Sequence, residues 1–215
     1  SPEQHVWGPR DYFKSPFYAA NPAAFISETG YHGAPAVESL RKFLSPEKLW
    51  PGHDNSEWIA HCTTPVYAYR VELMYRQIRE FFGIEPETLE EFVAASQIVQ
   101  AEAKKFFVEN VRAHKWEKSG ILWWNVMDCW PQFSDAVVDY YFNRKLAFDY
   151  IRRSQRPLQV ILGEWANWGH RVIVTNDTLA PVKGSVTVSD ADTGEILFAG
   201  DFEVPANANA DAGRF

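Results

Sequence analysis

Ala24-Phe25-Ile26-Ser27-Glu28-Thr29-Gly30 is a short apolar run that ends in a carboxylate and a Thr-Gly pair. A run of this length predicts a fully buried strand of a parallel sheet. Gly120–Val126, with the sequence Gly-Ile-Leu-Trp-Trp-Asn-Val, predicts a second buried strand that contains one polar Asn. Helical patterns lie between the two runs and after the second. The order strand, helices, strand, helix predicts parallel strands in an α/β fold.

The helices of this α/β portion are indicated by apolar residues at helical period and by start and stop signals. Thr88, with Glu91 three residues later, forms a capping box that predicts the start of a helix running to about Ala113. Gly83 predicts the end of the helix before it. The expected helices cover about residues 35–43, 64–82, 88–113 and 143–153, the first opening with Pro35 and the second with Thr64-Pro65. Two strands cannot close a sheet, so we expect this portion to be incomplete by itself.

The character of the sequence changes near Arg156-Pro157, where helical patterns give way to short β-type runs separated by turn signals. The turn signals recur about every ten residues, which is typical of an antiparallel sandwich. We expect strands at about 159–162, 171–176, 185–190 and 195–202. The Ala/Asn-rich stretch 206–212 is interpreted as a low-complexity tail. The predicted domains are residues 1–156 and residues 157–215, the second a partial β-sandwich.

The composition is that of a globular chain, with 46% hydrophobic and 23% charged residues among 215. The formal net charge of −7 argues against nucleic acid or an anionic membrane surface as a partner, because both require basic patches. No apolar run approaches the ~20 residues that span a bilayer. Aromatic residues make up 15% of the chain, and either a large core or a sugar-binding cleft explains that content. The sequence leaves the cellular compartment open.

Glu28 is the first candidate for chemistry. A carboxylate at the carboxyl end of a parallel strand points to the edge where barrel enzymes build their active sites. It stands on rigid backbone, as a nucleophile that attacks an anomeric carbon must. The alternative is a strand-end Glu that forms a salt bridge or a hydrogen bond with a neighbouring loop.

Aromatic and short polar side chains at the other strand end and near the N-terminus are candidates for sugar binding. Tryptophan faces stack on pyranose rings, and short polar side chains hydrogen-bond hydroxyl groups. A His and a Trp two residues apart face one side of an extended segment. Core packing is the alternative for some of the tryptophans. The substrate-binding candidates are His5, Trp7, Trp124, Asn125, Asp128 and Trp130.

No motif for a metal or a cofactor is present. The two cysteines, Cys62 and Cys129, have no metal-ligand spacing, and there is no His-Glu-x-x-His sequence. A Gly-rich phosphate loop and a Ser-centred nucleophile elbow are also missing. The sequence therefore predicts neither metal nor cofactor.

Several of these segments, taken in order, resemble glycoside hydrolase family 2. Ser27-Glu28-Thr29-Gly30, with Pro35 after it, resembles the nucleophile segment of that family. Gly120–Pro131 resembles its Gly-x-Leu-Tyr-Trp-Gln-Leu-Asn-Asp-x-Trp-Pro block on the last barrel strand. His5-Val6-Trp7-Gly8 resembles the His/Trp segment before the nucleophile strand. Val138-Asp139-Tyr140, followed by Lys145 and Tyr150, resembles the stretch after that block. The helix with Gln97, Glu102 and Ala103 resembles the helix between these motifs in the β-mannosidase-like branch. Together the resemblance covers nearly all of residues 1–156.

The resemblance implies the C-terminal part of an exo-acting retaining β-glycosidase with a (β/α)8 TIM barrel. Residues 1–156 would form the last two βα units of the barrel, and a partial immunoglobulin-like sandwich would follow. Glu28 would be the nucleophile at the end of the seventh strand, and Trp124 would lie on the eighth. The partner implied is a carbohydrate with a terminal β-linked sugar.

The same resemblance implies a second carboxyl group, the acid/base, roughly 5 Å from the nucleophile. In the family this is the Glu of an Asn-Glu pair, and no Asn-Glu dipeptide occurs in this chain. We therefore expect the 215 residues to be inactive by themselves. Open strand edges and an exposed apolar face would favour self-association.

Two departures from the family block leave the sugar specificity open. Met127 and Asn125 stand where Asn and Gln are common, so β-mannosidase, exo-β-glucosaminidase and β-galactosidase specificities all remain. A non-catalytic carbohydrate-binding or interaction module is the alternative from another functional class.

Overall fold

The computed structural model describes residues 2–62, 65–164 and 166–215, and these fall into two compact units. The first unit contains the described residues up to Phe107 together with Gly120–Arg152. The second contains Val108–Ser119 and the described residues from Arg153 to Phe215. Residues 108–119 therefore belong to the second unit, whereas a boundary at residue 156 would place them in the first. The predicted domain boundary itself stays a prediction.

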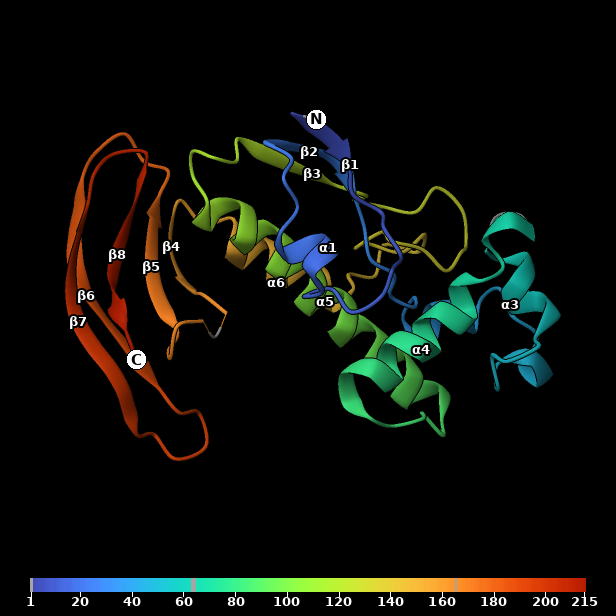
Figure 1. The fold of residues 1–215 in the computed structure, drawn as a ribbon. Helices are drawn as coiled ribbons and strands as arrows, with labels where there is room; N and C mark the ends of the chain where they lie inside the picture. The colour runs from blue at the N-terminus through green and yellow to red at the C-terminus, as the bar shows by residue number, and fades with distance from the viewer. Residues whose placement is uncertain (1, 63–64, 165) are drawn as a thin grey trace. The chain divides into compact units, whose positions relative to one another are not determined.

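The sheet of the first unit has three parallel strands in the order β1-β2-β3 (Figure 1). They are β1 (Glu3–His5), β2 (Phe25–Thr29) and β3 (Gly120–Trp123). Both predicted strands are present and parallel, but the expectation of only two strands is wrong. β1 escaped prediction because its three polar residues carry no strand pattern, and pairing with β2 makes the strand. The (β/α)8 barrel stays a prediction.

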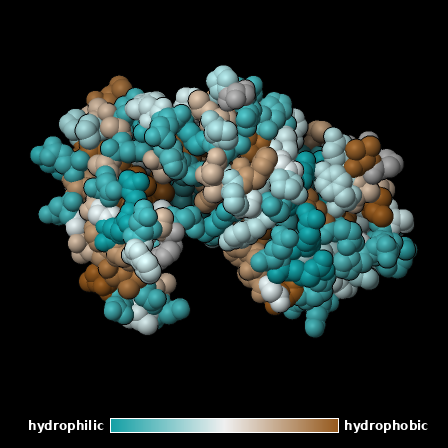
Figure 2. Space-filling model, in the orientation of Figure 1, coloured by the Kyte–Doolittle hydropathy of each residue, from teal (hydrophilic) through white to brown (hydrophobic). Residues whose placement is uncertain are grey.

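β3 is shorter and less buried than predicted. It ends at Trp123 rather than at Val126, and Leu122 within it is 58% exposed. Trp124 and Met127, which follow the strand, are exposed as well. On the face that Figure 2 shows, apolar residues form separate patches among hydrophilic ones. Self-association through an apolar face stays a prediction.

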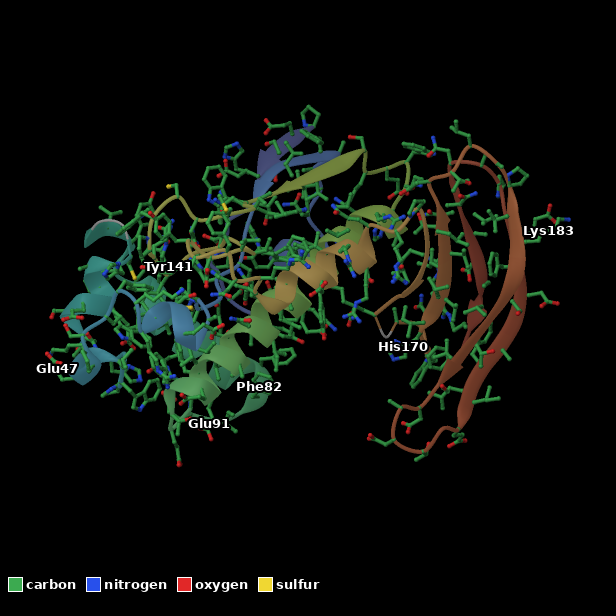
Figure 3. All side chains as sticks on the ribbon, turned by 180° about the vertical axis from the view of Figure 1, so that it is seen from behind. Glu47, Phe82, Glu91, Tyr141, His170 and Lys183 are labelled. Atoms are coloured by element: carbon green, nitrogen blue, oxygen red, sulfur yellow. The ribbon has the colours of Figure 1, made fainter. Side chains whose placement is uncertain are left out.

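The helices with strong end signals lie close to their predicted ranges. The structure contains α1 (Pro16–Ala19), α2 (Val37–Leu40), α3 (Ser56–Ala60), α4 (Arg70–Phe82), α5 (Leu89–Ala113) and α6 (Leu146–Ser154), with short 3-10 turns η1 (Pro46–Lys48) and η2 (Pro65–Tyr67). α4 ends at Phe82, which Figure 3 labels, because Gly83 adopts a left-handed φ of +69° and its N–H donates to Arg79 O at 2.9 Å.

The capping box at the start of α5 forms only in part. Thr88 Oγ1 accepts the N–H of Glu91 at 3.2 Å, as predicted. The carboxylate of Glu91 accepts the N–H of Glu87 at 2.9 Å, one residue before the expected donor. Both side chains nevertheless accept hydrogen bonds from backbone N–H groups at the start of α5.

Two helices differ from their predicted ranges. Only Val37–Leu40 of the expected helix 35–43 forms α2, and turns follow it. The helix expected from Thr64-Pro65 begins at Arg70, after the turn η2. Thr64 lies outside the described residues. Proline at the start of a segment is compatible with several turn types, so it did not fix the helix start.

The core of the first unit is built largely of aromatic rings. Trp58 stacks on Phe133 with 4.6 Å between ring centroids, and Tyr75 lies 4.5 Å from Phe92. All four side chains are completely buried. Core packing therefore accounts for part of the aromatic content.

The second unit contains two antiparallel sheets of the kind found in a β-sandwich. Their orders are β4-β5-β8 and β6-β7, and Figure 1 shows β6 and β7 as a long curved pair. On that pair Lys183, labelled in Figure 3, forms a salt bridge with Glu203 on the facing strand, with 2.9 Å between Nζ and Oε2. The strands are β4 (Leu158–Leu162), β5 (Arg171–Asn176), β6 (Val182–Ser189), β7 (Ile196–Val204) and β8 (Ala208–Arg214). In the part of the chain that the structure describes, no helix has both the length and the hydropathy of a membrane-spanning segment.

The interpretation of residues 206–212 as a low-complexity tail is wrong, because most of them belong to β8. This strand pairs antiparallel with β5, with Ala210 opposite Val174. Its Ala and Asn residues have weak strand preference, and the backbone hydrogen bonds to β5 outweigh that preference. Arg112, in the part of α5 that belongs to this unit, donates to Asp177 at 2.8 Å.

Candidate active site

Glu28 stands on β2 with two candidate residues of the β1 segment beside it. The indole Nε1 of Trp7 donates a hydrogen bond to Glu28 Oε1 at 2.7 Å. His5 Nδ1 lies 3.8 Å from the same oxygen. The register of the two parallel strands, in which His5 is opposite Glu28, produces this arrangement. The Glu28 side chain is 29% exposed, so its carboxylate remains accessible.

The ring of Trp7 is fixed by its surroundings. Gly30 leaves room for it, because a Cβ at that position would lie 2.6 Å from the Trp7 ring. The guanidinium of Arg10 lies 4.9 Å from the ring centroid, within the range of a cation–π contact. Tyr18 donates its hydroxyl to the Trp7 carbonyl at 2.9 Å. The donor to Glu28 is therefore held in place rather than free to rotate.

Trp124 and Asn125 follow β3 directly and are connected to the Glu28 strand through the backbone. The N–H of Trp124 donates to the carbonyl of Thr29, the neighbour of Glu28, at 2.6 Å. The Trp124 residue is 49% exposed, which suits a stacking surface. Asn125 is half-buried, and its carbonyl accepts the N–H of Val137 at 3.2 Å. The structure thus brings His5, Trp7 and Glu28 into contact and places Trp124 and Asn125 at the next strand end.

Asp128, a predicted sugar-binding residue, is buried in the structure, and its role in sugar binding stays a prediction. Its side chain is fully buried, and its Oδ1 accepts hydrogen bonds from Ser134 at 2.6 Å and Gln132 at 2.8 Å. Burial raises the pKa of this carboxyl, and the nearby Lys145 opposes the rise. The carboxylate therefore holds the turn after β3 together instead of facing solvent.

Trp130 also packs within the protein. Its ring stacks on His61, with 5.7 Å between centroids and 24° between planes. His61 Nδ1 in turn lies 2.7 Å from the carbonyl oxygen of Pro131. Trp130 is half-buried, so one part of it remains available to a ligand and its assignment stays a prediction.

A group of buried polar side chains lies in the same unit and was missed by the sequence analysis. His32 Nε2 is 3.3 Å from Asp135 Oδ2, and burial lowers the pKa of His32 to about 3. Burial likewise lowers the pKa of Lys104 to about 7, although Asp135 acts in the opposite direction. The available signal was the spacing of Gln100 and Lys104, four residues apart among the apolar positions of α5.

Gln100 on α5 binds the backbone after both β2 and β3. Its Nε2 shares its two N–H groups among the carbonyl oxygens of Tyr31, Asp135 and Ala136, at 3.0, 3.1 and 3.2 Å. These segments follow the two strand ends that carry the candidate residues. A helix side chain therefore satisfies backbone carbonyl groups of two segments that lie outside the strands.

The donor set suits carbohydrate chemistry better than metal binding. Within residues 2–62, 65–164 and 166–215, no cluster of three or more His, Cys, Asp or Glu side chains is arranged to hold a metal ion. A half-buried carboxylate with a fixed hydrogen-bond donor and neighbouring aromatic faces can attack or bind a sugar ring. The functional roles of the individual residues stay predictions.

Comparison with known proteins finds relatives that are named as glycosidases. No family model matches the chain. It is 30% identical over 145 residues to a β-mannosidase B of Thermothelomyces thermophilus, and 29% identical over 143 residues to an exo-β-D-glucosaminidase of Arthroderma benhamiae. Each alignment covers 63% of this chain and only 16% of the relative.

Solved structures match almost the whole chain. A β-D-mannosidase of Dictyoglomus thermophilum matches 99% of it with a TM-score of 0.81 and 30% identity. An exo-chitosanase of Amycolatopsis orientalis matches 100% with a TM-score of 0.72, and at 18% identity this likeness concerns the fold alone. The chain spans 26% of each of these two proteins.

Proposed function

Because this chain is related to one part of the enzymes in the β-mannosidase-like branch of glycoside hydrolase family 2, we propose that it carries the nucleophile of an exo-acting retaining β-glycosidase. The substrate class is a carbohydrate with a terminal β-linked sugar, with a β-mannoside as the first choice. Exo-β-glucosaminidase and β-galactosidase specificities are the alternatives for the sugar.

The observation that carries the proposal is the 2.7 Å hydrogen bond from Trp7 Nε1 to Glu28 Oε1. A retaining nucleophile must present one carboxylate oxygen to the anomeric carbon in a fixed direction. Since Oε1 accepts the indole N–H, we assign the attack to Oε2. His5, beside the carboxylate, and the exposed ring of Trp124 would contact the sugar.

The reaction proceeds in two steps. Glu28 Oε2 forms a bond to the anomeric carbon while the bond to the glycosidic oxygen breaks, and the acid/base carboxyl gives that oxygen its proton. Water then attacks the same carbon, the acid/base carboxylate takes a proton from the water, and the bond to Glu28 breaks. The configuration at the anomeric carbon is retained.

The acid/base group is the part that these residues do not provide. It stands roughly 5 Å from the nucleophile in retaining enzymes, and the chain has no Asn-Glu dipeptide. We therefore propose that the 215 residues act as part of a longer enzyme and do not turn over substrate alone. Robust hydrolysis of a nitrophenyl β-mannoside by the pure chain would contradict this part of the proposal.

The test of the nucleophile is mechanism-based labelling of the full-length natural protein with 2-deoxy-2-fluoro-β-mannosyl fluoride, followed by peptide mass mapping. We expect a stable adduct on Glu28 and none in the Glu28→Gln variant. An adduct on another residue would overturn the site. An adduct that forms only with a gluco- or galacto-configured reagent would keep the mechanism and change the sugar. Sugar binding without an adduct from any reagent would favour the non-catalytic binding module.

A further inference from the structure

Lys104 on α5 is one of the largest completely buried side chains of the first unit. The residue is 1% exposed. Its neighbour Lys105, on the same helix, is 41% exposed at the side chain and pairs with Glu102 at 3.5 Å. A lysine is rarely buried so fully unless it has a specific partner, because removing an ammonium group from water is costly.

The partner of Lys104 is the backbone at the end of β3. Its Nζ donates a hydrogen bond to the carbonyl oxygen of Trp124. The same ammonium lies 5.4 Å from the ring centroid of Trp123. The N–H of Trp124 meanwhile donates to Thr29 O at 2.6 Å. Trp124 is therefore held on its amide side by the neighbour of Glu28 and on its carbonyl side by Lys104.

Burial and nearby charges act on the Lys104 amine in opposite directions. Burial lowers the pKa of Lys104 to about 7, the carboxylate of Asp135 raises it, and the ammonium of Lys145 lowers it further. Asp135 itself lies 3.3 Å from His32 Nε2. The protonated amine makes a charge-assisted bond to a carbonyl that is roughly twice as strong as the bond from the neutral amine. The hold on Trp124 therefore weakens as the amine loses its proton.

We propose that Lys104 is a positioning residue, which fixes the carbonyl of Trp124 and thereby aims the Trp124 ring and Asn125 at the sugar that Glu28 attacks. The proposal rests on the proposed glycosidase function for its last step only. The hydrogen bond and its dependence on the Lys104 amine are properties of the chain whether or not it acts on sugars.

The bond can be observed at a single site by NMR. Trp124-Asn125 is the only Trp-Asn pair in the sequence. A chain labelled with 13C at tryptophan carbonyls and 15N at asparagine therefore gives one carbonyl–nitrogen correlation in a carbon-detected spectrum. We expect this carbonyl resonance to move to lower frequency as the pH rises from about 5.5 to about 8.5, with its midpoint near the Lys104 pKa of about 7.

Two variants make the NMR measurement specific. Lys104→Met, of similar volume and without charge, should abolish the titration, and Lys105→Met should leave it unchanged. A wild-type resonance that does not move with pH, or one that titrates equally in Lys104→Met, would overturn the proposal. A wild-type resonance that does not move with pH overturns the proposal even if Lys104→Met fails to fold.

The link to function is tested by the rate of labelling of Glu28 in the full-length natural protein. We expect Lys104→Met to lower the second-order rate by roughly 10-fold or more, as small misplacements of contact groups do. The pH dependence near 7 should disappear in Lys104→Met, and Lys105→Met should behave as wild type. Equal rates and equal pH profiles in wild type and Lys104→Met would refute the positioning role. Failure of the wild type to label at all would instead refute the proposed function, and the NMR titration would still test the bond.

Discussion

Replacement of His32 by Gln should change how the free energy of unfolding depends on pH. His32 is buried, and burial lowers its pKa from the ordinary value of 6.5 to about 3. Above pH 6.5 the imidazole is neutral in both the folded and the unfolded chain, so it adds no pH dependence. As the pH falls through 6.5, the unfolded chain takes up a proton that the folded chain refuses until about pH 3. Stability is therefore lost as the pH falls through this window.

The magnitude follows from the two pKa values. Each pH unit in the window corresponds to 1.36 kcal/mol, so the full loss across the window from pH 6.5 to about 3 is on the order of 5 kcal/mol. Gln is chosen because it is polar, does not titrate and can still bond the groups near His32 Nε2, which are Asp135 and Arg10. The wild type should therefore lose stability relative to His32→Gln by about 1.4 kcal/mol for each pH unit below 6.5.

The assay is urea unfolding followed by tryptophan fluorescence, repeated at steps from about pH 7 to about pH 4. The result of interest is the difference between the two free-energy curves, because it removes the contribution of every other titrating group. Parallel curves for wild type and His32→Gln across this range would refute the conclusion that burial holds His32 neutral.

Of three further changes, two test the candidate site and one tests a histidine elsewhere in the first unit. Trp7→Phe keeps a ring and removes the N–H donor, so labelling of Glu28 in the full-length natural protein should slow by roughly 10-fold to 100-fold; an unchanged rate would show that the donor is dispensable. Gly30→Ala forces a Cβ to 2.6 Å from the Trp7 ring, so it should slow labelling and destabilise the fold by about 1–3 kcal/mol, measured by urea unfolding. His53→Gln should change the pH dependence of the free energy of unfolding in the direction opposite to His32→Gln. Burial lowers the pKa of His53, but hydrogen bonds to the carboxylates of Glu72 and Glu85 outweigh it and raise this pKa. The stability that His53 contributes is therefore present below its unfolded pKa and is lost as the pH rises through its folded pKa. An identical pH profile for His53→Gln and wild type would contradict that assignment.

The parts of the fold that could be predicted are those with local signals. Gly83 ended α4 because only a left-handed residue closes a helix in that way, and Thr88 began α5 through its own side chain. β1 and β8 could not be predicted from their residues, which are polar in one case and rich in alanine in the other. Each becomes a strand through pairing with a neighbour distant in the sequence, and the sequence of the segment itself does not record that pairing.

The candidate site shows the same division. The spacing of His5 and Trp7 predicted that they would face one side, and both contact the same oxygen of Glu28. The burial of Asp128 could not be predicted, because it depends on a turn that returns Ser134 to its carboxylate. The position of Lys104 beneath the Trp124 carbonyl likewise depends on how α5 packs against the end of β3.

The contacts of Gln100 have a consequence for how this protein can evolve. One side chain bonds three carbonyl oxygens, and a carbonyl oxygen is the same whichever amino acid carries it. A substitution at position 31, 135 or 136 therefore cannot compensate for the loss of the amide at position 100. Correlated substitutions, from which spatial contacts are often inferred, should be absent here although the segments are tightly joined. In a saturation library of the full-length natural protein, position 100 should tolerate few residues, and no second-site change at its three partners should restore the lost variants.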